Sequence, residues 1–436
     1  MTTERLRPRD LPQVLEDLAT GPYPEYIDEV LATTARMRQR PAWTFPERWL
    51  PAIDVARQPA FAPRIRWGSI SVALVLIALL LAAISVFIGT QRRVPEPFGP
   101  ARNGLVAYEA DGDIYTADPV TGVATAIVSG PDTDVGPRFS LDGTRIVFER
   151  KVDGGRGQLY VARSDGSHLT LITRDPLFLQ PGDYGRAWER YQFSPDGNSV
   201  LIATQADAIP SIAIAQSDGS NVRQLRLGVH AREPSFRPPD GAEILFVGFS
   251  RGDRGLFAVD PTGGTVRQIV KVAPGYDLAG ASWSPDGSRI AYWRWDTTVA
   301  GLSSESRVVN ADGSGDRGLP SPEGADWDAH ATWSNDGTQL FIARGYTQSF
   351  DDVRGVVLPA DGSSAGTEVA PAGSVETECC AAWMWSPDDS KVLGRTTPIR
   401  GGAVRYIVID IAAREARPAP WTSASDPSWQ RLATIP

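Results

Sequence analysis

A short string recurs six times in residues 102–436, and it restricts the fold of this chain more than any other feature. Each copy has an aromatic residue, then Ser-Pro-Asp-Gly or a close variant, then an apolar run. Its aspartates are Asp142, Asp196, Asp240, Asp286, Asp336 and Asp388. They are separated by 44 to 54 residues. A period near fifty with four short strands per unit is typical of β-propeller blades.

Each copy can be interpreted as a strand, a turn and a second strand. The aromatic residue ends the first strand, and the alternating run after the turn forms the second. In the turn, Asp accepts hydrogen bonds from backbone amides and Gly takes the positive φ. Later Asp-Gly pairs, beginning at Asp165, Asp218 and Asp312, indicate an outer hairpin. Asp389 stands in place of glycine in the last copy.

The two ends of the repeat array complement each other. Residues 103–108 are predicted to form a second strand with no aromatic strand before it. Residues 426–431, around Trp429, are predicted to form an aromatic strand with no second strand after it. Together they predict a mainly β fold, a seven-bladed β-propeller closed by the C-terminal strand. This closure removes open sheet edges.

The repeat resembles that of the TolB-like (WD-repeat-like) β-propeller family, whose copies read Trp/Phe-Ser-Pro-Asp-Gly before an apolar run. The copies at Phe193 and Trp283 match this pattern fully. The resemblance covers nearly all of residues 102–436 and implies the propeller fold. TolB itself binds a partner in the cell envelope, and some relatives gate peptidases. Seven blades instead of six, without a TolB-type N-terminal domain, distinguish this chain from TolB.

An uncharged stretch at residues 68–89 is the second strong constraint. Thirteen of its positions are Leu, Ile, Val or Phe. As a helix, these residues extend over roughly 33 Å at 1.5 Å per residue, whereas a hydrocarbon core is about 30 Å thick. A buried core helix is the alternative, but soluble helices are seldom apolar on every face. We therefore predict a transmembrane helix over residues 67–90 and a membrane-anchored member of the family.

The predicted helix divides the chain into parts on two sides of a cell membrane. Residues 1–66 form a short helical and Pro-aromatic segment, residues 91–101 a Pro-rich stalk, and residues 102–436 the propeller. Arginines are slightly more frequent before the span than after it, which favours a cytoplasmic N-terminus and an extracytoplasmic propeller. They are Arg48, Arg57, Arg64 and Arg66 before it, and Arg92, Arg93 and Arg102 after it.

The segment 1–66 contains a run with three aromatic residues among prolines. Trp43, Phe45 and Trp49 are candidates for docking a cytoplasmic protein partner or for the headgroup layer. Alternatively, they pack on the predicted helix before them. Anti-sigma factors share this layout, so a transmembrane regulator that binds a transcription partner is an alternative function. Many anti-sigma factors carry a His/Cys zinc motif there, and residues 1–66 contain neither His nor Cys.

Charge and motifs exclude several classes of function. The formal net charge is −9, of which residues 1–66 contribute +1 and Arg92 with Arg93 +2, leaving −12 for residues 94–436. An acidic domain argues against a nucleic-acid partner. We find no nucleotide-binding glycine motif, no zinc spacing of histidines and no hydrolase domain after the last blade. We therefore expect a non-enzyme without a cofactor, which binds or senses a protein, peptide or envelope ligand.

Acidic residues and histidines cluster in the segments that enter the inner strands. Such segments converge near one mouth of a propeller channel, which predicts a ligand-binding rim for a cation or a basic peptide. In the alternative, turns favour Asp and each carboxylate caps its own loop. Whether a metal binds is left open. The candidate rim residues are Asp134, His230, Glu233, Asp277, Asp326, Asp328, His330, Glu378 and Asp426.

The two cysteines, Cys379 and Cys380, are adjacent. A trans peptide places their Cα atoms about 3.8 Å apart, below the usual disulfide range of about 4.4–6.8 Å. A bond between them would be strained, and the two would form a redox pair. Two thiols on a half-buried strand are the alternative.

Overall fold

The computed structural model describes residues 98–180, 190–206, 209–250, 253–329, 331–348, 352–370, 383–396, 405–423 and 425–433. In these ranges no helix is long and apolar enough to cross a membrane. The predicted transmembrane helix at residues 67–90 lies outside them and stays a prediction, as do the predicted segment 1–66 and most of the stalk.

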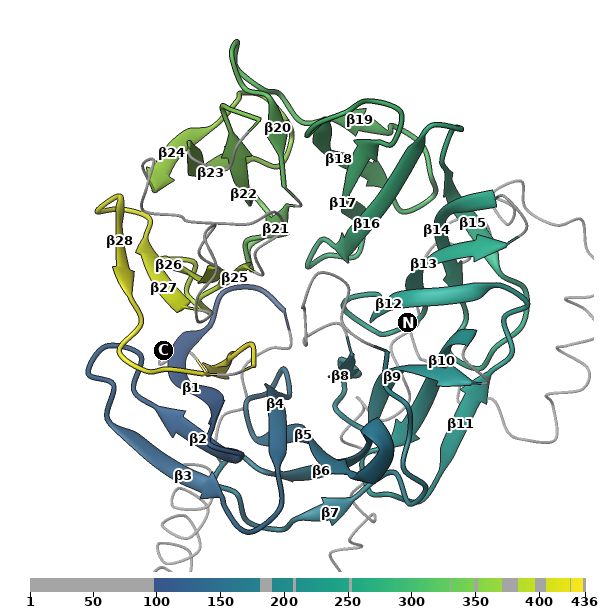
Figure 1. The fold of residues 1–436 in the computed structure, drawn as a ribbon, viewed down its shortest axis with the longest axis vertical. Helices are drawn as coiled ribbons and strands as arrows, with labels where there is room; N and C mark the ends of the chain where they lie inside the picture. Colours follow the sequence, from purple (N-terminus) through teal and green to yellow (C-terminus); the bar gives the residue numbers. More distant parts are fainter. Residues whose placement is uncertain are drawn as a thin grey trace, which may run out of the picture. The chain divides into compact units, whose positions relative to one another are not determined.

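The described strands form seven antiparallel sheets arranged in a ring (Figure 1). Blade 1 consists of β29 (Ser428–Leu432), β1 (Arg102–Ala110), β2 (Asp113–Ala117) and β3 (Ala124–Val128). Blade 2 consists of β4 (Asp134–Phe139), β5 (Arg145–Val152), β6 (Arg156–Arg163) and β7 (Thr170–Leu171), with a 3-10 turn, η3 (Asp153–Gly155), before β6. Blade 3 consists of β8 (Tyr191–Phe193), β9 (Ser199–Ala206), β10 (Ile209–Gln216) and β11 (Val222–Leu225).

The remaining four blades follow in chain order. Blade 4 consists of β12 (His230–Phe236), β13 (Ile244–Ser250), β14 (Asp253–Val259) and β15 (Arg267–Lys271). Blade 5 consists of β16 (Tyr276–Trp283), β17 (Arg289–Asp296), β18 (Ser304–Asn310) and β19 (Arg317–Gly318). Blade 6 consists of β20 (Trp327–Asp328), β21 (Thr332–Trp333), β22 (Gln339–Gly345), β23 (Val353–Pro359) and β24 (Thr367–Ala370). Blade 7 consists of β25 (Trp383–Trp385), β26 (Lys391–Thr396), β27 (Arg405–Asp410) and β28 (Glu415–Pro418).

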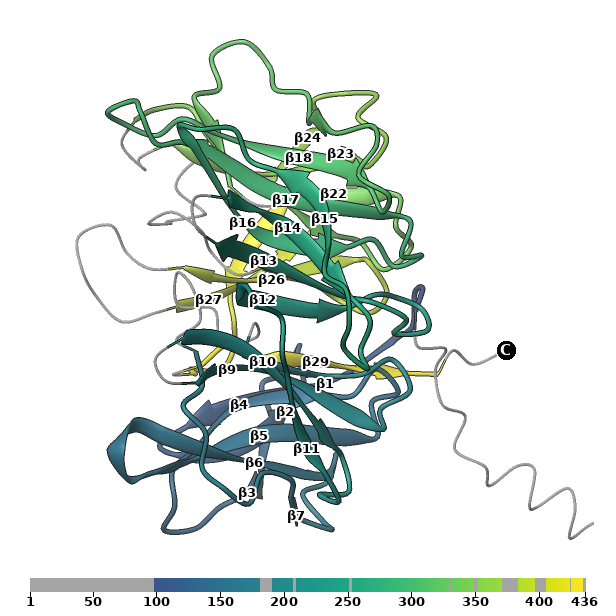
Figure 2. The same ribbon diagram turned by 90° about the vertical axis from the view of Figure 1, so that its right-hand side faces the viewer.

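The C-terminal strand closes the ring. β29 pairs antiparallel with β1, with Val106 opposite Trp429 and Ala107 opposite Ser428. Figure 2 shows β29 beside β1, at the innermost position of blade 1. The prediction of a mainly β, seven-bladed propeller is therefore confirmed, including the blade shared by the two ends of the array.

The apolar core lies between the blades. Val147 and Leu159 of blade 2, for example, pack in one cluster with Val200 and Ala213 of blade 3, and all four are at most 3% exposed. Similar clusters join each neighbouring pair of blades around the ring. Because each sheet is covered on both faces, its strands are apolar on both faces near the middle.

In blades 2 to 7 the repeated string forms a hydrogen-bonded turn after the inner strand. In blade 5, Ser284 Oγ donates to Asp286 Oδ1 at 2.5 Å, and the amide of Arg289 donates back to Ser284 Oγ at 2.9 Å. Gly287 has φ +67°, and a Cβ there would lie 2.0 Å from the carbonyl oxygen of Pro238, so only glycine fits. The Ser–Asp bond recurs at Ser140–Asp142, Ser194–Asp196, Ser334–Asp336 and Ser386–Asp388.

These turns should make the propeller sensitive to acid. Partial burial raises the pKa of Asp142, but hydrogen bonds from Ser140 and Thr144 outweigh it and hold the pKa below its ordinary value. Asp196, Asp286, Asp336 and Asp388 show the same net lowering. Their stabilisation is present above the unfolded carboxyl pKa of about 4 and is lost as the pH falls through the lower folded value.

We expect Asp142→Asn to lower the free energy of unfolding at pH 7 by about 1 kcal/mol, because hydrogen bonds to a charged acceptor are stronger. The difference from wild type should shrink as the pH falls below about 4 and the aspartate itself becomes protonated. Urea unfolding at several pH values measures both quantities. Glu323→Gln, on an exposed loop, is the control and should change neither. If the difference in free energy of unfolding between wild type and Asp142→Asn stayed constant with pH, Asp142 would not stabilise the turn through its charge.

Candidate functional site

Two of the predicted rim carboxylates form ion pairs inside their own blades. Asp134 is 1% exposed and accepts hydrogen bonds from Arg150 Nε at 2.7 Å and Nη2 at 2.9 Å. Asp328 accepts the same bidentate contact from Arg344, at 2.7 and 3.1 Å. In both cases the arginine is the residue opposite the aspartate on the next strand. Burial raises the pKa of Asp328, and the hydrogen bonds and charge of Arg344 oppose that shift.

Two other predicted residues come together between blades 4 and 5. Glu233 and Asp277 both line a cavity of about 290 Å³. Glu233 has φ +50° in a bulge of β12, and its Oε2 accepts the backbone N–H of Gly280 in blade 5 at 2.6 Å. Asp277 is paired with Arg254. This cavity therefore contains compensated charges and not a bare acidic surface.

The remaining rim residues are dispersed. His230 lies next to the same cavity, because its ring contacts the lining residue Phe249 edge-on at 4.5 Å between centroids. Asp326 is exposed, and Asp426 lies in the central channel. Among the described residues, no three His, Cys, Asp or Glu side chains are grouped to hold a metal ion. The other predicted site residues lie outside the described ranges: His330, Glu378, Cys379, Cys380, Trp43, Phe45 and Trp49. Cation or peptide binding at the rim stays a prediction.

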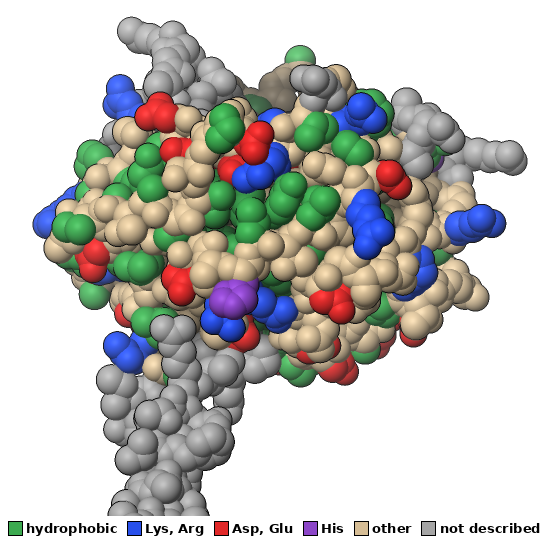
Figure 3. All heavy atoms as spheres, turned by 90° about the horizontal axis from the view of Figure 1, so that it is seen from below, with side chains coloured by type: hydrophobic (Ala, Val, Ile, Leu, Met, Phe, Trp, Pro, Cys, Tyr) green, Lys and Arg blue, Asp and Glu red, His purple; other side chains and the backbone are tan. Residues whose placement is uncertain are grey.

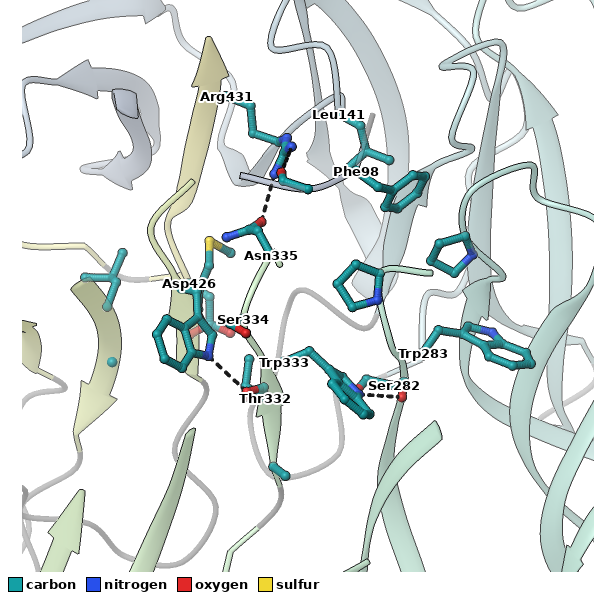
Figure 4. A pocket seen from close by; sticks show the side chains of 18 of the residues that line it. Phe98, Leu141, Ser282, Trp283, Thr332, Trp333, Ser334, Asn335, Asp426 and Arg431 are labelled. Carbon is teal, nitrogen blue, oxygen red and sulfur yellow. Dashed lines mark hydrogen bonds between the residues drawn. The ribbon is translucent and has the colours of Figure 1, made fainter. Parts of the chain in front are cut away.

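A larger feature is a cavity of about 320 Å³ in the central channel, whose lining comes from six blades (Figure 4). Trp283, Trp333 and Trp385, the aromatic residues of three repeats, lie along its wall, with Tyr406 beside them. A second ring comes from repeat position +2, two residues after the aromatic. It consists of Leu141, Pro238, Pro285, Asn335 and Arg431.

The tryptophans connect neighbouring blades. Trp333 Nε1 donates to the carbonyl oxygen of Ser282 at 3.2 Å, and Trp385 Nε1 donates to that of Thr332 at 2.9 Å (Figure 4). Within the described part of the chain, the hydroxyl groups of Ser282 and Thr332 and Nε1 of Trp283 are buried without a hydrogen-bond partner. The wall combines mainly apolar aromatic surface with a few polar side chains, among them Asn335, Asp426 and Arg431, a combination typical of ligand sites.

One carboxylate faces this cavity. Asp426 is 3% exposed and follows the same repeat register as Glu233, three residues before the aromatic. Its neighbour Pro427 accepts a hydrogen bond from Arg138 Nη1 at 2.9 Å. Burial lowers the pKa of Arg138, and the carboxylate of Asp426 opposes that shift. The described lining contains no second carboxylate, His or Cys.

Three residues that differ from the repeat consensus lie together at the mouth of this cavity. The sequence analysis did not predict that they would be close. Asn335 and Arg431 occupy position +2, where most copies have proline, and Asp389 replaces glycine with φ +59°. Asp389 accepts the backbone N–H groups of Asn335 at 2.7 Å and Asp336 at 3.0 Å. Arg431 Nη1 donates to Asn335 Oδ1 at 2.7 Å. The signal was available as polar residues at repeat positions that ordinarily need none.

The buried ion pair in blade 6 gives a direct test of what the rim carboxylates do. We expect Arg344→Met to lower the free energy of unfolding by about 3–5 kcal/mol, because Asp328 would be left buried without its cation. Arg354→Met is the matched control. Arg354 binds Asp352 in the same bidentate way, but both are about one-third exposed, so the loss should be about 0–1 kcal/mol. If Arg344→Met lowered the free energy of unfolding in urea as little as Arg354→Met does, the Asp328–Arg344 pair would not be structural.

Relatives agree with the observed fold. Residues 97–275 match the sequence model of the TolB beta propeller domain, PD40. A protein TolB homolog from Chlorobium luteolum is 26% identical over 156 residues, which are 36% of this chain and 32% of that protein. The chain therefore spans about a third of the length of the curated relative that it matches.

Two solved structures share the architecture at low identity. The oligogalacturonate lyase of Vibrio parahaemolyticus is 16% identical, covers 73% of this chain and 92% of its own, and has a TM-score of 0.53. An oligogalacturonate lyase in complex with manganese is 15% identical, covers 73% and 90%, and has a TM-score of 0.52. At these identities the similarity shows the fold alone.

Proposed function

We propose that this protein is a non-catalytic binding protein that captures a protein or peptide in its central channel. The propeller fold and the match of residues 97–275 to the TolB beta propeller model support this proposal. The observation that carries the proposal is the channel cavity, with its aromatic wall and the polar side chains of Asn335, Asp426 and Arg431 among its lining residues. An extended peptide fits this chemistry, since its backbone supplies donors and acceptors and its side chains supply apolar surface. Burial of one large apolar side chain contributes about 1.5–3 kcal/mol.

The charges of the domain suit a protein or peptide better than nucleic acid. On the face shown in Figure 3, acidic and basic side chains are interspersed. The ion pairs at Asp134, Asp277 and Asp328 compensate charge in the same way near the starts of the inner strands. Nucleic-acid binding depends on a continuous basic surface, and such mixed charge does not supply one.

We further propose that a single transmembrane helix at residues 67–90 anchors the protein, with residues 1–66 cytoplasmic and the propeller outside. The uncharged 68–89 stretch and the arginine distribution support this proposal. The anti-sigma-like alternative depends on a cytoplasmic partner for residues 1–66, which lie outside the described ranges. It stays a prediction.

Photo-crosslinking in cells tests the channel as the binding site. A p-benzoylphenylalanine in place of Leu141, at the cavity, should give a discrete protein or peptide adduct. The same group in place of Val120, which is 78% exposed on the outside of blade 1, should not. Adding Ser282→Phe, which fills the cavity, should reduce the Leu141 adduct at least tenfold. Equal adducts at both positions, or none at Leu141, would overturn the proposal.

Protease protection on spheroplasts tests the proposed topology. With tags at Met1 and Pro436, we expect added protease to remove the C-terminal tag and to leave the N-terminal tag intact until the membrane is lysed. The reverse pattern would place the propeller in the cytoplasm. Degradation of both tags in intact spheroplasts would contradict the anchoring itself.

A further inference from the structure

The segment that precedes β1 lies in the mouth of the channel cavity. Phe98 is one of the side chains that line it, next to the ring of position +2 residues (Figure 4). The carbonyl oxygen of Gly99 accepts a hydrogen bond from Arg431 Nη2 at 2.5 Å. The amide of Ala101 donates to the carbonyl oxygen of Pro387 in blade 7 at 2.7 Å. The chain therefore enters the propeller through the cavity that the proposed function uses.

The contacts that receive this segment come from three blades. Arg431 of blade 1 is 8% exposed and joins Gly99 to Asn335 of blade 6. Asn335 Nδ2 in turn donates to Ser386 O at 2.9 Å and to Asp389 Oδ1 at 2.7 Å, both in blade 7. Burial lowers the pKa of Arg431 while the charge of Asp389 opposes that shift, so the guanidinium is held in a charged but enclosed setting. A receptor for one backbone carbonyl is thus assembled from residues that break the repeat.

Gly99 has a conformation that suits this role. Its φ is +87°, which turns the chain between Phe98 in the cavity and Ala101 on blade 7. Residues with a Cβ rarely adopt such a φ, so glycine is the residue that suits this turn. Because of the turn, the Phe-Gly pair places an aromatic side chain at the cavity and a carbonyl oxygen at Arg431.

We propose that the channel mouth is a binding site for an extended Phe-Gly peptide segment, and that the protein's own residues 98–99 occupy it as a tethered ligand. This inference deepens the proposed function and rests on it, because it concerns the same cavity. A segment tethered by a short linker has an effective concentration of about millimolar. An external peptide that uses these contacts must displace the linker, so its binding would release the segment that leads toward residues 67–90.

The test uses the full chain and a blocked peptide of residues 94–101, Val-Pro-Glu-Pro-Phe-Gly-Pro-Ala. Intrinsic fluorescence reports binding, because Trp283, Trp333 and Trp385 line the cavity. Wild type should show no saturable change up to about 1 mM peptide. Phe98→Ser, whose own linker fits poorly, should bind the peptide saturably, and a peptide with Ser in place of Phe should not bind.

The arginine is tested in the Phe98→Ser background. Adding Arg431→Met should lower the affinity for the peptide at least tenfold. Adding Arg289→Met should not, although Arg289 also donates two hydrogen bonds to turn carbonyls, those of Ala360 and Gly337, at 3.1 Å each. Thermal unfolding shows whether each variant is folded, and the Arg289→Met pair corrects for a general loss of stability.

Equal behaviour of wild type and Phe98→Ser, whether both bind the peptide or neither does, would overturn the tethered-ligand proposal. Equal weakening by Arg431→Met and Arg289→Met would overturn the role of the arginine. The proposed function fails separately, through the absence of the Leu141 adduct in cells. A Leu141 adduct in cells, together with no peptide binding to Phe98→Ser, would support the channel as a binding site. It would contradict the proposal that residues 98–99 occupy that site.

Discussion

The pairing of β29 with β1 is the interaction on which the rest of this structure depends. Each blade buries both of its faces against neighbours, so a ring with one missing contact would expose two apolar sheet faces. Closure by a strand from the other end of the chain removes that gap and also places Arg431 at the channel mouth. A single strand pairing thereby supports both the interblade cores and the candidate site.

The inner strands have two tasks that use different repeat positions. The aromatic residues and their Nε1 groups connect one blade to the next, as Trp333 and Trp385 do. The residues at position +2 face the mouth of the cavity and vary from blade to blade. A propeller can therefore change its ligand chemistry at position +2 without disturbing the contacts that hold the ring together.

The candidate rim illustrates the limit of inference from residue type. An aspartate before an inner strand indicates a turn or a binding group equally well. Which of these it serves depends on the residue opposite it in the next strand, and that register is shifted by a bulge in β4, β12 and β16. Arg150 and Arg344 each lie 16 residues after their aspartates, a spacing that becomes meaningful only once the hairpin length is known.

The sequence by itself determined the period, the turn chemistry and the number of blades, because those depend on contacts within about ten residues that recur in register. It also showed that the two ends of the array complete one blade. Only the tertiary structure decided that Asn335, Asp389 and Arg431 form one network around Gly99. Asn335 and Arg431 are 96 residues apart in the chain. Their contact follows from the angular placement of blades around the ring, which leaves no local pattern in the sequence.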